Sequence, residues 1–132
     1  MIYFWIALGS AIGGVARHGC NNLVAGAFGQ AFPWGTIAVN VTGSFLIGVL
    51  ASMDSFPGRL GLPGPEARAF LMVGVCGGYT TFSAFSLQTL DLLRAGHWPQ
   101  ALGNIALSVT LCLVAVWLGH RAYTVLAVGR TG

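Results

Sequence analysis

The sequence has 132 residues, of which 55% are hydrophobic and only 7% are charged. A soluble domain carries about 25% charged residues, so a soluble protein this small could not cover its surface with so few charges. The net charge is +3, from six arginines and three acidic residues, too few and too scattered for the clustered basic face of a nucleic-acid-binding protein. We therefore expect one membrane-embedded domain, residues 1–132, with the lipid bilayer as its partner and no nucleic acid.

The apolar stretches predict four spans. A helix needs about 20 mostly apolar residues to cross the hydrocarbon core of a bilayer. Such stretches cover about residues 2–27, 33–53, 66–95 and 99–126. No basic stretch precedes the first, so we expect it to be retained rather than removed as a signal peptide. The sequence thus predicts an all-α membrane protein with four transmembrane helices.

The centre of the third span is a poor sequence for a continuous helix. Two glycines, Gly77 and Gly78, precede Tyr79 and two β-branched residues, Thr80 and Thr81. A membrane helix breaks only where protein, water or an ion satisfies the freed backbone groups, and unwound carbonyls often surround a cation. The glycines can instead serve close helix packing. The pattern leaves both interpretations open, a break near residues 77–81 or packing alone.

Small residues also recur in the first two spans. Gly9 and Gly13 form a GxxxG spacing, and Gly43 and Gly48 lie along the second span. Such faces let helix backbones approach closely in a bundle or in an oligomer, and the spacing does not decide between the two.

Asn40 and Arg17 are among the polar residues at membrane depth, and each has two interpretations. Asn40, near the middle of the second span, is either a helix–helix hydrogen-bonding group or a ligand group. Arg17, well inside the first span, either extends its head group to the membrane interface or lines a positive vestibule that attracts anions.

The third and fourth spans carry two further patterns. Phe82 and Phe85 share a helix face, where they are either packing residues or present their partially positive ring edges to a small anion. A stripe on the fourth span either joins helices or lines a wet path. This stripe consists of Asn104, Ser108 and Cys112.

Several function classes find no support. No carboxylate lies in the middle of the first, second or fourth span, whereas a proton-coupled transporter needs an ionisable group in its pathway. No catalytic motif occurs, so we expect no enzyme. The three cysteines have no metal-binding spacing and are interpreted as small packing residues.

The arginines indicate the topology only weakly. An even number of spans places both termini and the 54–65 link on one side of the membrane. That side has four arginines, against at most two, Arg17 and Arg94, on the other. The four are Arg59, Arg68, Arg121 and Arg130. The positive-inside rule then favours cytoplasmic termini, and so small a bias is compatible with insertion in both orientations.

Three long motifs, in this order, closely resemble the bacterial Fluc (CrcB) fluoride channels. They are residues 13–17 (GGVAR), 33–48 (PWGTIAVNVTGSFLIG) and 74–85 (GVCGGYTTFSAF). The resemblance implies a fluoride-selective passive channel in the bacterial inner membrane that exports fluoride and relieves its toxicity. It further implies an antiparallel, dual-topology homodimer with two pores, and a third helix broken at its centre.

The resemblance also assigns roles to residues. Phe82 and Phe85 would meet fluoride with their ring edges, and Asn40 would donate its amide to the ion. Ser108, Thr81 and Ser83 would complete the pore, and Arg17 would lie toward a vestibule. A structural Na⁺ at the dimer centre would be bound by the backbone carbonyls of Gly77 and Thr80 from each subunit.

Three positions depart from the family pattern. His18 stands where tyrosine is common, and Asn104 and Cys112 stand where the polar track of the fourth helix tends toward hydroxyl groups. Two rival functions stay open. A small multidrug exporter would need a carboxylate in the first helix, which is absent here, and a non-transporting assembly subunit would use the glycines and Asn40 only for packing.

Overall fold

The computed structural model describes residues 1–55 and 61–128, and the described part of the chain contains helices and no strand. The all-helical prediction is therefore confirmed. The helices are α1 (Ile2–Phe28), α2 (Trp34–Ser55), α3 (Gly64–Arg68), η1 (Ala69–Cys76), α4 (Gly77–Tyr79), α5 (Phe82–Arg94) and α6 (Trp98–Val128). The ends of the four long segments differ from the expected limits by no more than two residues.

The third long segment has the least regular winding. It consists of α3, η1, α4 and α5 in succession, and η1 is a π-helix of eight residues. The sequence did not predict this wider winding. π-Helical turns are rare and occur frequently at functional sites, so the segment that precedes the expected break is already unusual.

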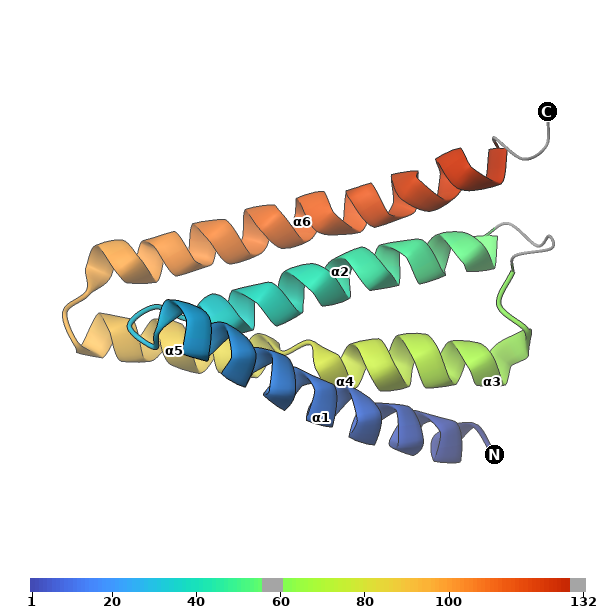
Figure 1. Ribbon diagram of the computed structural model, residues 1–132, viewed down its shortest axis with the longest axis horizontal. Coiled ribbons are helices and arrows are strands. Elements are labelled where there is room, and N and C mark those ends of the chain that lie inside the picture. Colours follow the sequence, from blue (N-terminus) through green and yellow to red (C-terminus); the bar gives the residue numbers. More distant parts are fainter. Residues whose placement is uncertain (56–60, 129–132) are drawn as a thin grey trace.

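The four long segments form an antiparallel bundle in which the start of α1 and the end of α6 lie at the same end (Figure 1). α3 lies at this end as well, so the expected shared side for the termini and for Arg68 agrees with the architecture. Arg59 and Arg130, which contributed to the predicted charge bias, lie outside the described residues.

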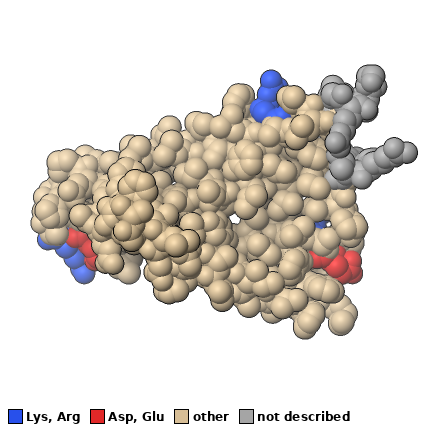
Figure 2. Space-filling model, in the orientation of Figure 1, with Lys and Arg blue, Asp and Glu red and all other residues tan. Residues whose placement is uncertain are grey.

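Among the described residues, three segments are long and apolar enough to cross a membrane: Trp34–Met53, Gly64–Arg94 and Trp98–Ala127. The four expected long segments are all present, and α1 is the one that does not meet this measure of hydropathy. This helix has 27 residues, but Arg17, His18 and two asparagines lower its hydropathy. On the face that Figure 2 shows, charged side chains lie only toward the two ends of the molecule. The chain is a multi-pass membrane protein with four long helical segments, of which α1 alone falls outside the three spans named above.

Glycines let α1 approach the third segment at backbone distance. A Cβ atom on Gly9 would lie 2.9 Å from Cα of Gly74, and one on Gly78 would lie 2.6 Å from the carbonyl oxygen of Ser10. A Cβ on Gly13 would meet the carbonyl of Val75. The GxxxG spacing of α1 therefore serves packing within one chain, which settles the role that the sequence left open for it.

α2 and α6 form a second close pair. Gly48 faces the Val116 carbonyl, and a Cβ atom on Gly119 would lie 3.0 Å from the carbonyl carbon of Phe45. The buried Ser52 hydroxyl lies 2.6 Å from Nδ1 of His120. The bundle thus contains two closely packed pairs, α1 with the third segment and α2 with α6.

Candidate functional site

Two threonines separate α4 from α5 and have extended backbone conformations. Thr80 has φ −82° and ψ 158°, and Thr81 has φ −152° and ψ 113°. The N–H of Thr80 still bonds the Cys76 carbonyl at 3.0 Å, and its hydroxyl donates to the same oxygen at 2.9 Å. The Thr81 hydroxyl accepts from the N–H of Ala84 at 3.1 Å and so caps α5. One threonine therefore ends a helix, and the next begins another.

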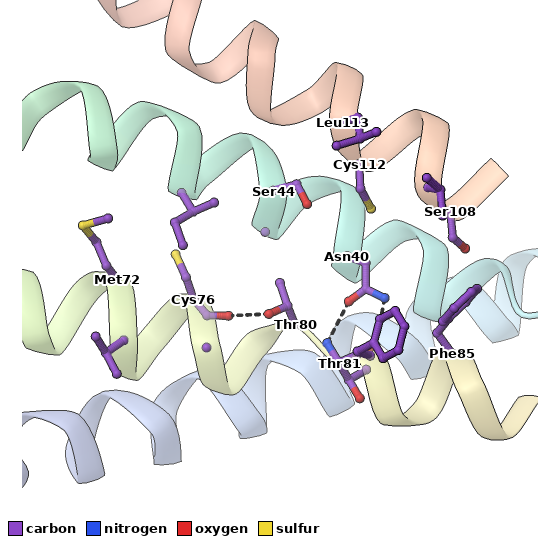
Figure 3. Close-up of a pocket in the computed structure, with 16 residues that line it drawn as sticks. Asn40, Ser44, Met72, Cys76, Thr80, Thr81, Phe85, Ser108, Cys112 and Leu113 are labelled. Atoms are coloured by element: carbon purple, nitrogen blue, oxygen red, sulfur yellow. Dashed lines mark hydrogen bonds between the residues drawn. The ribbon is translucent and has the colours of Figure 1, made fainter. Parts of the chain in front are cut away.

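The side chain of Asn40 holds this extended segment from α2 (Figure 3). Its Nδ2 donates to the Thr81 carbonyl at 2.9 Å, and its Oδ1 accepts from the Thr81 N–H at 2.7 Å. In a continuous helix that N–H would bond the Gly77 carbonyl. The amide thus replaces the helical partners of Thr81, and it keeps a second Nδ2 proton because an amide nitrogen carries two.

Arg17 reaches the same segment from α1. Its Nη1 donates to the Thr80 carbonyl at 3.2 Å, and the residue is half-buried. The head group is therefore directed toward the middle of the bundle rather than toward the membrane interface. Two side chains from two different helices satisfy the carbonyls of Thr80 and Thr81.

A cavity of about 550 Å³, here called the central cavity, lies beside the segment on the α6 side (Figure 3). Its walls come from α2, η1, α4, α5 and α6, and most of them are apolar. The predicted residues that line it are Asn40, Gly77, Thr80, Thr81, Phe82, Phe85 and Ser108. Further lining residues, which the sequence did not single out, include Ser44, Met72 and Cys76.

The two phenylalanines differ in burial although they are neighbours. Their ring centroids lie 5.2 Å apart at an interplanar angle of 51°. Phe85 is only 9% exposed, whereas Phe82 is 76% exposed in the single chain. An aromatic ring so exposed beside a cavity can meet lipid, a partner or an ion.

A second cavity of about 440 Å³, here called the Arg17 cavity, lies on the α1 side of the break. It is lined mainly by polar residues, among them the predicted Arg17, Thr81 and Ser83. Thr81 lines both cavities, so the extended segment is the partition between them. Asn21 and Thr36 line both the Arg17 cavity and a third, smaller polar cavity of about 310 Å³. Asn21 follows Arg17 by one helical turn, a spacing that could have identified it from the sequence.

The predicted polar stripe of α6 divides between two environments. Ser108 and Cys112 line the central cavity. Asn104 is only 1% exposed and bonds Thr89 of α5 and Ser108 instead. The helix-joining interpretation is thus confirmed for Asn104, and the wet path stays a prediction for Ser108 and Cys112. Thr89 was missed, although it follows Phe85 at helical i, i+4 spacing.

The described residues contain no cluster of three or more His, Cys, Asp or Glu side chains that could hold a metal ion. Backbone oxygens are the alternative ligands. Gly77 has lost its helical donor, because the Thr81 N–H bonds Asn40. Thr80 accepts from Arg17, but a carbonyl has a second lone pair. Both oxygens therefore fit a hard cation such as Na⁺, which prefers oxygen ligands.

The family described as "CrcB-like protein, Camphor Resistance (CrcB)" matches residues 4–120. A protein of Methylocella silvestris is 57% identical over 120 residues, which cover 91% of each chain. One of Opitutus terrae is 56% identical, over 92% of this chain and 91% of its own. One of Paramagnetospirillum magneticum is 51% identical, over 96% of this chain and 98% of its own. All three relatives are named fluoride-specific ion channel FluC.

Proposed function

The chain belongs to the CrcB-like family, and from this premise we propose that it is a passive, fluoride-selective channel that exports fluoride across the bacterial inner membrane. The observation that supports this most is the position of the α4–α5 break. Its extended residues Thr80 and Thr81 separate two cavities, and Thr81 lines both of them. A short polar partition between two cavities is a suitable barrier for a small ion to cross.

The cavity walls suit an anion. Among the described residues that line the three cavities, Arg17 is the one with a formal charge. No Asp or Glu side chain lines any of the three cavities in the described part of the chain. A positive group draws anions into a low-dielectric cleft. The absence of a wall carboxylate also agrees with passive flow rather than proton coupling.

The donors near the partition are numerous and weak, as conduction requires. A pore must bind its ion favourably enough for entry and weakly enough for exit. Fluoride would meet the second Nδ2 proton of Asn40, the hydroxyls of Thr81, Ser83 and Ser108, and the ring edges of Phe82 and Phe85. None of these groups carries a full charge that would trap the ion, and the one charged group nearby, Arg17, already donates to the Thr80 carbonyl.

The working unit is a homodimer of antiparallel, dual-topology subunits with two pores. Support comes from Phe82, whose ring is 76% exposed, and from Gly77, which is exposed beside it on the open side of the central cavity. A second copy that covers this side would bury both. A Na⁺ ion between the subunits would be held by the Gly77 and Thr80 carbonyls of each, because the Gly77 oxygen has lost its helical donor and the Thr80 oxygen keeps a second lone pair.

Efflux from proteoliposomes that contain only this protein tests the proposal. The vesicles hold potassium fluoride and potassium chloride, a potassium ionophore balances charge, and separate electrodes record both anions. The channel predicts rapid fluoride release without chloride release. No fluoride release from a correctly folded protein would contradict it and favour the assembly-subunit interpretation.

A further inference from the structure

A buried chain of hydrogen bonds joins α5 to α6 beside the central cavity. The Thr89 hydroxyl donates to the Phe85 carbonyl at 2.8 Å, and Nδ2 of Asn104 donates to the Thr89 oxygen at 2.9 Å. The Ser108 hydroxyl in turn donates to Oδ1 of Asn104 at 3.3 Å. Thr89, Asn104 and Ser108 are 9%, 1% and 6% exposed, so all three side chains are buried.

The direction of the chain is set at its Phe85 end. A hydroxyl has one proton, and Thr89 gives it to a backbone carbonyl, which can only accept. Thr89 can therefore only accept from Asn104, and the amide must turn its NH₂ group toward Thr89. Its oxygen then faces Ser108, so Ser108 must be the donor of the last bond.

This direction matters because Ser108 lines the central cavity. While its proton points to Asn104, the hydroxyl presents lone pairs to the cavity, and lone pairs repel an anion. Fluoride can receive a hydrogen bond from Ser108 only if the hydroxyl turns away from Asn104. At 3.3 Å the bond to Asn104 is longer than the usual 2.7–2.8 Å for O–H···O, so the exchange is energetically accessible.

We propose that Asn104 is a positioning residue that competes with fluoride for the Ser108 proton and so weakens fluoride binding beside Phe85. The inference rests on the proposed function, because it assumes that fluoride passes Ser108. Asn104 does not line the central cavity, so it would act on fluoride only through Ser108. The benefit to a channel is faster release of the ion.

The test is a mutant cycle read by the fluoride concentration that gives half-maximal efflux from proteoliposomes. Asn104→Leu removes the competing acceptor and keeps the side-chain volume. We expect the half-maximal concentration to fall about two- to tenfold, the range for one modest hydrogen bond. Thr89→Val removes the bond that fixes the Asn104 amide, so the amide can turn its NH₂ group toward Ser108. The half-maximal fluoride concentration should then fall as well. This variant provides the test if Asn104→Leu does not fold.

The decisive comparison repeats both substitutions in a Ser108→Ala background, where no proton remains to compete for. The inference predicts that neither then changes the half-maximal concentration. Thr110→Ala, an exposed hydroxyl on α6 outside the cavity walls, is the matched control and should change nothing. Equal effects with and without Ser108 would overturn the inference while leaving the channel function intact. A wild-type protein that releases no fluoride would overturn both.

Discussion

Two asparagines at membrane depth serve different kinds of partner. Asn40 bonds the N–H and the carbonyl of one backbone residue, Thr81, 41 residues away in the sequence. Asn104 bonds two side chains, Thr89 and Ser108. Backbone groups freed by a helix break cannot find new partners easily, whereas hydroxyls can rotate. An intramembrane amide that replaces a backbone hydrogen bond is therefore needed to keep the backbone in place. An amide that joins two side chains can be lost at a smaller cost, because those side chains can turn to other partners.

The largest expected effect comes from Asn40→Ala. It leaves two backbone groups of Thr81 unsatisfied, each at a cost of about 1–3 kcal/mol, so the extended segment should lose its position. We expect fluoride efflux to fall at least about tenfold and the thermal unfolding temperature in detergent to fall with it.

The control for this variant is Asn22→Ala on α1. Asn22 is exposed, bonds only His18 within its own helix among the interactions described, and lines neither of the two cavities that Thr81 separates, so efflux should persist. Wild-type efflux from Asn40→Ala would show that the break does not depend on the amide, and the contrast between the two asparagines would disappear.

The next effect is expected from the two phenylalanines, which lie between the two asparagine sites. Phe82→Ile and Phe85→Ile remove the partially positive ring edges, so fluoride efflux should fall sharply in both. Phe85→Ile should also lower stability, because Phe85 is 9% exposed, whereas Phe82 is 76% exposed in the single chain. Unchanged efflux in both variants, measured on folded protein, would remove the rings from the pathway.

The smallest effect should come from Ser108→Ala. Ser108 shares its role with other hydroxyls along the cavity walls, and its proton is already engaged by Asn104. Efflux should therefore fall less than in Asn40→Ala under the same conditions. If Ser108→Ala reduced efflux more than Asn40→Ala, the bonds among Thr89, Asn104 and Ser108 would control conduction, rather than the bonds of Asn40 to the Thr81 backbone.

The sequence predicted the helices well because their signals are local. Apolar stretches and the Thr80–Thr81 pair carry the information within a few residues. The π-helical winding of η1 was missed, because it has no comparable local signal. α1 is less apolar than a membrane span usually is, because Arg17, His18 and two asparagines lie within six residues of one another.

The sequence motifs predicted the residues of the candidate site, but they did not predict the hydrogen-bond partners of those residues. The bond between Asn40 and Thr81, and that between Arg17 and Thr80, depend on how three helices rotate against one another. The same is true of Asn104, whose bond to Thr89 depends on the rotation of α5 against α6. Long-range pairing of this kind follows from packing and cannot be read from spacing alone.

Fluoride is proposed to cross the extended segment, Thr80 and Thr81, between the Arg17 cavity and the central cavity. Ser83→Cys, in a background without the three native cysteines, places a thiol on the wall of the Arg17 cavity. Ser86→Cys, one turn away on α5 and outside both cavity walls, is the control. A water-soluble, charged thiol reagent should stop fluoride efflux only in Ser83→Cys, and fluoride should slow the modification. Full efflux from completely modified Ser83→Cys protein would contradict this pathway.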